Sequence, residues 1–253
     1  MKSIQFYKRV ILIFIIIINY SSFSQNGKIT LVTYKMQNTF VTREEFAKNG
    51  TSVEDLKWYD DYIAAFEQIE FELLYDSNKS IFKLVDKLEL IEDFNYKKVS
   101  LIVGNNVNYK NNSIKEKLFY TDNFGEIFNV ILSFDEYKWE ITTETKIIDG
   151  YKCYKATSTK EKYDRLGNKN GFYYPYAWFT PEIPSSFGPA GLDGLPGLVL
   201  EGSVKGAKFV YYASKINLDY ITKKDIERPT CSNEISQAEY LDLSLKKIKE
   251  INR

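Results

Sequence analysis

Strand-like segments follow one another along most of this chain, with no clear helical pattern between them. Apolar and charged residues alternate in Ile69–Leu73 and again in Lys115–Thr121, as expected when one face of a strand is buried. Asp149-Gly150 lies between two such segments and provides the positive φ values of a tight hairpin turn. A second hairpin is expected to turn at Lys205-Gly206. Successive strands without crossover helices predict an antiparallel sheet.

The expected fold class is mainly β, a single strongly curved antiparallel sheet that resembles half a barrel. About ten to twelve strands in a meander must curl or pack against something to bury one face. In the centre, Ser100–Val103 and Val107–Tyr109 are interpreted as one strand broken by a turn at Asn105-Asn106. The sheet is expected to form one domain, residues 25–253, because no linker rich in Pro, Gly or Ser divides the chain.

The last twenty residues change character, because apolar residues recur there at helical spacing. This pattern predicts one amphipathic C-terminal helix within residues 233–252, with Ser232 as its N-cap. The helix is expected against the concave side of the sheet or across its opening.

The absence of histidine from the 253 residues excludes several kinds of catalytic site. Histidine is the commonest general base and metal ligand. Ser-His-Asp catalysis, Cys-His catalysis and histidine-containing zinc motifs are therefore excluded. No pair of carboxylates has a spacing that demands catalysis, so we expect a protein that is not an enzyme and has no catalytic residues, metal or cofactor. No basic run stands out either, which argues against nucleic acid as a partner.

The first 24 residues have the layout of a secretory signal peptide. Lys2, Lys8 and Arg9 precede the apolar run Val10–Ile18, and Ser22-Phe23-Ser24 provides small residues before a cut after Ser24. The apolar run is much shorter than the roughly 20 residues of a membrane span. No cysteine lies near the cut, so we do not expect a lipoprotein. The mature chain, without a transmembrane segment, is expected in the periplasm or outside the cell.

Two cysteines, Cys153 and Cys231, remain in the mature chain. An oxidising compartment permits a disulfide between them, but two separate thiols fit the sequence equally well.

One segment, Phe187–Leu200, carries glycines at every third position from Gly188 to Gly197. Three Gly-x-y triplets are too few for a collagen helix. A phosphate-binding loop is also disfavoured, because no Lys or Ser/Thr follows the last glycine. The glycines and prolines instead predict a tight, folded-back loop before a strand at Leu198.

This segment resembles the signature of the GLPGLI family, with Val in place of the final Ile. The matching residues are Gly194, Leu195, Pro196, Gly197, Leu198 and Val199. Further stretches resemble the family in the same order, namely 137–141, 150–157, 177–184 and 187–189. The resemblance implies an exported protein of the Bacteroidota without an established activity, and it provides no catalytic residues. The link Lys160–Gly171 is longer than the family pattern.

A curved sheet with an apolar concave face favours a binding protein for an apolar ligand, such as a lipid or a lipoprotein-like molecule. Trp139, Trp178, Phe179 and Phe187 are the candidates for lining that face, although each also fits ordinary core packing. The alternative is a module that docks on an envelope protein through the Gly/Pro-rich loop 187–200. A hydrolase is a third and less favoured reading.

Overall fold

The computed structural model describes residues 29–251, apart from 39–41, 49, 91, 124, 164–167, 207–208 and 223–224. The predicted signal peptide, residues 1–24, lies outside the described residues.

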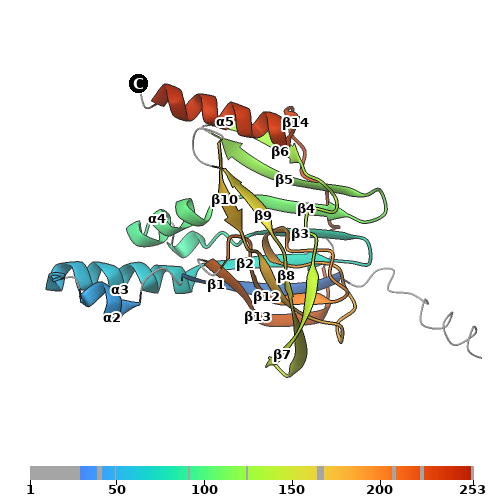
Figure 1. Cartoon of the computed structure of the whole chain (residues 1–253), viewed down its shortest axis with the longest axis horizontal. Coiled ribbons are helices and arrows are strands. Elements are labelled where there is room, and N and C mark those ends of the chain that lie inside the picture. The colour runs from blue at the N-terminus through green and yellow to red at the C-terminus, as the bar shows by residue number, and fades with distance from the viewer. Residues whose placement is uncertain are drawn as a thin grey trace, which may run out of the picture.

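Within the described part of the chain, twelve strands form one sheet in the order β14-β6-β5-β4-β3-β2-β1-β13-β12-β11-β8-β7, and β9 and β10 form a separate pair (Figure 1). The strands of the large sheet are β1 (Ile29–Asn38), β2 (Glu70–Tyr75), β3 (Lys79–Leu84), β4 (Val107–Asn111), β5 (Glu116–Asn123), β6 (Glu126–Ile131), β7 (Glu140–Ile148), β8 (Tyr151–Thr157), β11 (Tyr176–Thr180), β12 (Leu198–Ser203), β13 (Phe209–Tyr220) and β14 (Glu234–Ser236). The separate pair consists of β9 (Lys160–Tyr163) and β10 (Lys169–Tyr173). The helical segments are α2 (Arg43–Ala47), α3 (Val53–Gln68), η1 (Leu88–Leu90), α4 (Phe94–Val103), η2 (Pro189–Gly191) and α5 (Gln237–Ile251).

The prediction of a mainly β fold is confirmed, but the predicted sheet shape is wrong in two respects. The large sheet is mixed, because β14 pairs with β6 in parallel. The sheet is also neither closed nor strongly curled. Strong curvature is unnecessary because other elements cover the apolar face. Phe66 of α3, Val99 of α4 and Phe187 of the β11–β12 loop all belong to the same buried cluster as the sheet residues.

Strand β1 lies in the middle of the sheet and joins its two halves. It pairs with β2 on one side and with β13 on the other, so residues 29–38 meet residues 209–220. Tyr34 of β1 is completely buried, and its hydroxyl donates a 2.5 Å hydrogen bond to the carbonyl oxygen of Val199 at the start of β12. Strand β1 therefore joins strands from the beginning and the end of the described chain in one sheet.

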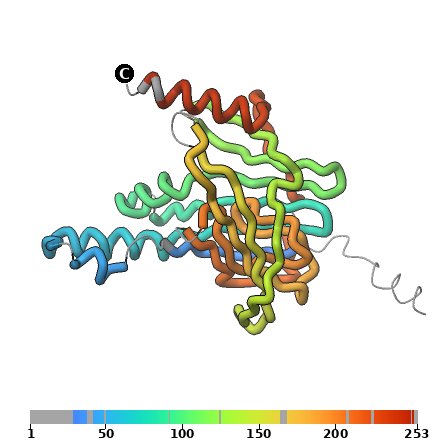
Figure 2. Tube along the Cα trace, viewed as in Figure 1, coloured from blue at the N-terminus to red at the C-terminus, as the bar shows by residue number. Residues whose placement is uncertain are grey.

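Three helices, α2, α3 and α4, gather beyond one end of the strands β1 to β4 (Figure 2). The predicted strand at Ser100–Val103 is wrong, because these residues form the last turn of α4. Asp93 caps the helix by accepting a 2.7 Å hydrogen bond from the Tyr96 backbone, and Gly104, with φ +76°, ends it. Tyr96 and Val99 lie three residues apart and are both buried, which fixes the helical conformation.

The predicted C-terminal helix is confirmed as α5, although its start and its position differ from the prediction. Ser236, not Ser232, accepts a hydrogen bond from the Glu239 backbone, because residues 234–236 first pair with β6. The helix lies at the edge of the sheet formed by β14 and β6 rather than in a concavity, with Tyr240 packed against Phe119 and Phe128 (Figure 1). Among the described residues, no helix combines the length and the apolar character needed to cross a membrane.

The two hairpins predicted from turn residues are both present. At the β7–β8 turn, Asp149 and Gly150 have φ values of +48° and +82°, as a type I′ turn requires. At the β12–β13 turn, Gly206 has φ +66°.

Cys153 and Cys231 are both free thiols. Cys153 is buried in β8, whereas Cys231 is partly exposed before β14, at the other end of the strand order. Burial raises the pKa of Cys153 to about 11. We therefore expect one thiol, Cys231, to react with Ellman's reagent at pH 8 in the folded protein, and both to react in urea. Cys231→Ser should abolish the fast reaction, and persistence of that reaction in this variant would contradict the structure.

Candidate functional site

The Gly/Pro-rich loop between β11 and β12 folds back on itself and lies mostly inside the protein. The backbone of Gly194 donates to Ser186 at 2.9 Å, and that of Val199 donates to Phe187 at 3.2 Å. Of the signature residues, only Gly194 and Pro196 are exposed. Around the loop, η2 packs against β3, β4 and β12. The loop therefore links strands from both halves of the sheet.

A line of five alternating charges fastens this loop to the sheet, and we call it the charge chain. It consists of Lys110, Asp193, Lys117, Glu136 and Lys160. The Asp193 carboxylate lies 2.6 Å from the ammonium group of Lys110 and 2.9 Å from that of Lys117. The Glu136 carboxylate pairs with the ammonium group of Lys117, at 2.6 Å, and with that of Lys160. The charges come from β4, β5, the β6–β7 connection, β9 and the Gly/Pro-rich loop.

The charge chain offsets a repulsion between two lysines that the strand pairing places side by side. Lys110 and Lys117 lie directly opposite each other in the β4–β5 pair, where like charges repel. Their side chains are only 6% and 2% exposed, so water screens the repulsion poorly. Asp193, 7% exposed, places one carboxylate oxygen on each ammonium group. The carboxylate of the loop is therefore a structural counter-ion of the sheet.

Glu136 remains ionised at neutral pH despite its burial. Burial alone would raise the pKa of Glu136, but the positive charges and hydrogen bonds of Lys117 and Lys160 outweigh it and leave the pKa below the usual value. A folded-state pKa below the unfolded one stabilises the folded state above the ordinary glutamate pKa, and this stabilisation is lost as the pH falls through the lowered pKa.

Trp139, one of the predicted binding residues, holds the loop in place. Its indole nitrogen donates a 2.7 Å hydrogen bond to the backbone oxygen of Asp193, and its ring stacks on Tyr137 with centroids 4.9 Å apart. Tyr137 in turn lies beneath the ammonium groups of Lys117 and Lys160. These aromatic rings cover the charge chain from one side.

The other three predicted binding residues also serve packing. Phe179 and Phe187 are almost completely buried in core clusters, the latter against Tyr75. Trp178 packs on the main core, and Lys146 lies 4.5 Å above its ring. None of the four predicted residues lines the groove described next.

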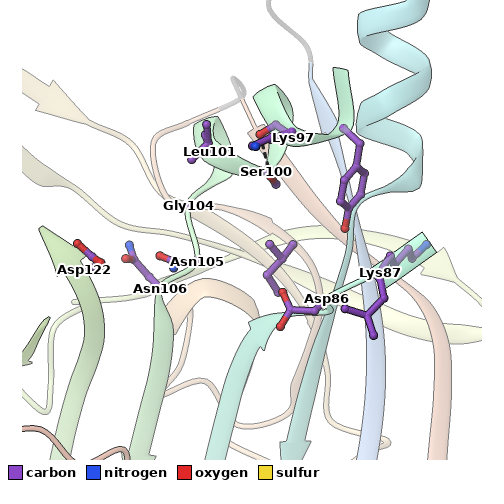
Figure 3. A pocket seen from close by; sticks show the side chains of 12 residues that line it. Asp86, Lys87, Lys97, Ser100, Leu101, Gly104, Asn105, Asn106 and Asp122 are labelled. Atoms are coloured by element: carbon purple, nitrogen blue, oxygen red, sulfur yellow. Dashed lines mark hydrogen bonds between the residues drawn. The ribbon is translucent and has the colours of Figure 1, made fainter. Parts of the chain in front are cut away.

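A groove lies between α4 and the ends of strands β3, β4 and β5 (Figure 3). Its volume is about 820 Å³, which falls within the roughly 300–1,000 Å³ typical of small-molecule sites. The lining combines apolar walls with several polar groups. The lining residues are Leu84, Asp86, Lys87, Leu88, Tyr96, Lys97, Ser100, Leu101, Gly104, Asn105, Asn106 and Asp122.

The groove has a polar end and an upper wall formed by α4. Figure 3 shows Asn105, Asn106 and Asp122 together at one end, with Ser100 and Leu101 of α4 above them. Asp86 and Lys87 lie toward the other end, after β3. Hydrogen-bonding groups are therefore available at both ends of a partly apolar space.

Tyr96 contributes a buried hydroxyl group without a hydrogen-bond partner. Tyr96 is only 5% exposed and lines the groove, yet its hydroxyl forms no hydrogen bond within the protein. Burial raises the pKa of Tyr96; the nearby Lys87 main chain lowers it, and the negative charges of Asp86, Glu89 and Glu70 raise it further. The Lys87 main chain thus influences the hydroxyl but does not form a hydrogen bond with it. A buried hydroxyl without a hydrogen bond is energetically unfavourable, and a bound molecule could supply the missing partner.

Sequence reasoning missed this groove because it assigned Ser100–Val103 to a strand. The one signal that favoured a helix was the spacing of Asp93, Tyr96 and Val99, with a capping residue followed by two apolar ones. Within the described residues, no group of three or more His, Cys, Asp or Glu side chains is placed to hold a metal ion.

Comparisons with known proteins agree with the resemblance of the signature segment and with the fold. The family described as "Protein of unknown function (Porph_ging)" matches residues 172–201, which include the whole signature. This partial match gives weak support to a GLPGLI-type family. No curated protein sequence matches the chain.

Two solved structures of PNGF-II, in the P21 and C2 space groups, are similar to this protein. Their sequences are 17% and 18% identical to it, and both superpose with a TM-score of 0.54. Each match covers 87% of this chain but only 34% and 33% of PNGF-II. The chain thus spans about a third of the length of PNGF-II, and at this identity the similarity concerns the fold alone.

Proposed function

We propose that this protein is an exported binding protein, without catalytic activity, that holds one small ligand with an apolar body in the groove beneath α4. The observation that carries the proposal is the buried Tyr96 hydroxyl without a partner, set in a groove of about 820 Å³. A preformed concave space with apolar walls and a few polar groups is typical of a ligand site.

The shape of the walls favours an elongated apolar body. Leu84 and the Tyr96 ring form the inner wall, and Leu88 and Leu101 are exposed at 77% and 75% on the rim. Large apolar side chains that remain this exposed become buried when an apolar molecule lies between them, which contributes roughly 25 cal/mol for each Å² removed from water. The ligand site proposed here therefore lies beneath α4 and not on the face of the sheet where the sequence predicted it.

Docking through the Gly/Pro-rich loop is less well supported. Apart from Gly194 and Pro196, the residues of the loop from Phe187 to Leu200 are buried or nearly so. A partner would meet little of the segment that the resemblance singles out. The loop and its charge chain are better explained as the fastening between the two halves of the sheet.

A groove-blocking substitution tests the proposed site. Ser100→Trp places an indole ring in the groove, so we expect at least tenfold weaker binding of the fluorescent apolar probe N-phenyl-1-naphthylamine. Lys98→Trp is the matched control, because Lys98 lies on the same helix but does not line the groove. It should bind the probe like the unmodified protein.

Folding of each variant is checked by circular dichroism and by its melting temperature. Leu101→Asn provides a second test, because a side chain that is 75% exposed contributes little to folding but forms part of the apolar rim. Equal probe binding by the unmodified protein and both groove variants would overturn the proposal. Mass spectrometry of organic extracts from the native envelope protein would identify a retained ligand.

A further inference from the structure

The charges around the groove are balanced in number but not in effect. Two acids, Asp86 and Asp122, and two lysines, Lys87 and Lys97, line it. Lys87 is already paired with Glu70, with its ammonium group 3.2 Å from the carboxylate. Its charge is therefore largely neutralised within the protein, and the charge offered to a ligand is negative.

Negative charges also act on the buried hydroxyl of Tyr96. Asp86 lines the same groove as Tyr96, and Asp86 and Glu89 both act on this hydroxyl, whereas Lys97 is an exposed part of the lining. A tyrosine hydroxyl without a partner can accept a hydrogen bond from a cationic donor, and the nearby carboxylate charges favour that donor. An anionic head group at this position would meet repulsion instead.

We infer that the groove selects an aliphatic molecule with a protonated amine, whose ammonium group binds at Tyr96 and Asp86 and whose chain lies along Leu84, Leu88 and Leu101. This inference rests on the proposed function, since it assigns the ligand class of the same groove. Hydrogen bonds from a charged donor are stronger than neutral ones, so the amine contributes both affinity and orientation.

Three ligands of equal chain length test the head group. Decylamine, decanol and decanoate are each titrated against probe-loaded mature protein at pH 7.4 and 150 mM salt, below their micellar concentrations. We expect decylamine to displace the probe at a concentration at least tenfold lower than decanoate, with decanol in between. Binding of decanoate as tight as that of decylamine would overturn the inference.

Variants separate a specific head-group site from general attraction to an acidic protein. Tyr96→Phe and Asp86→Asn should each weaken decylamine binding about three- to tenfold and leave decanol binding within twofold. Asp149→Asn removes the same charge in the β7–β8 turn, where Asn also tolerates the positive φ, and should change neither. An equal effect of Asp149→Asn and Asp86→Asn would refute the site.

The two proposals fail in different ways. If none of the three ligands displaces the probe, or if Ser100→Trp does not affect probe binding, the groove is not the ligand site. If decanol and decanoate displace the probe as well as decylamine does, and Ser100→Trp abolishes binding, the groove binds apolar chains but the amine assignment is wrong.

Discussion

Asp193→Asn should lower the free energy of unfolding by about 3–5 kcal/mol, the usual effect of removing one partner from a buried ion pair. The substitution keeps the size of the side chain but removes the charge that lies between Lys110 and Lys117. These two lysines face each other across β4 and β5 and are almost completely buried. Lys110 would then remain buried without a carboxylate partner, and Lys117 would keep only Glu136. Urea unfolding followed by tryptophan fluorescence and by circular dichroism measures the change.

A surface ion pair provides the matched control for this prediction. Glu144 pairs with Lys155 at 3.0 Å, but its side chain is 55% exposed. Exposed pairs contribute only about 0–1 kcal/mol, so Glu144→Gln should have little effect. An Asp193→Asn variant no less stable than Glu144→Gln would show that the charge chain does not support the fold.

A second substitution distinguishes the loss of a charge from general damage to the loop. Adding Lys110→Met to Asp193→Asn removes the ammonium group that has lost its carboxylate partner and leaves an apolar chain of similar length. The double variant should therefore recover part of the lost stability, since replacing buried ions by apolar groups is often neutral or stabilising. A double variant that is less stable than Asp193→Asn would indicate that the lysine stem or its contact with Phe134 matters more than its charge.

The parts of the fold that could be predicted are those specified by neighbouring residues. Asp149-Gly150 determines its hairpin without outside help, because both residues adopt the positive φ that the turn needs. The C-terminal helix could be predicted for the same reason, from the helical spacing of its own apolar residues. Its cap could not, because residues 234–236 are drawn into pairing with β6 before the helix starts at Gln237.

The parts that could not be predicted depend on residues distant in sequence. The β1–β13 pairing places Ile29 opposite Tyr220, and no pattern among neighbouring residues predicts this contact. Helix α4 was missed because Val99, Ile102 and Val103 are β-branched residues that favour strands. Packing of Tyr96 and Val99 into the core overrides that preference. This error concealed the groove, one wall of which is α4.

The site illustrates the same limit on a smaller scale. The aromatic residues chosen from the sequence are the most conspicuous apolar side chains near the signature, and the structure uses them for packing. The charge chain is invisible in the sequence, because lysines such as Lys110 and Lys117 have the appearance of exposed strand residues. Only the fold shows that the loop supplies Asp193 between them.

Replacing either of the two signature glycines, Gly194 or Gly197, by alanine should lower the stability of the protein by very different amounts, because each glycine is required for a different reason. A Cβ at Gly197 would lie 2.2 Å from the backbone oxygen of Thr180, which is held in register by the β11–β12 pairing. We expect Gly197→Ala to lower the free energy of unfolding by about 3 kcal/mol, the upper end for overpacking. Gly194 has open space around it but a φ of +86°, so Gly194→Ala should lower the free energy of unfolding by only about 1–2 kcal/mol.

Asparagine separates the two causes. Because Asn tolerates the left-handed conformation better than Ala, Gly194→Asn should be more stable than Gly194→Ala in the same urea titration. At Gly197 the φ lies outside the left-handed region and the obstacle is the Thr180 backbone, so Gly197→Asn should be at least as unstable as Gly197→Ala. A larger loss at Gly194 than at Gly197 would mean that backbone conformation, and not the close approach of β11, makes the signature glycine necessary.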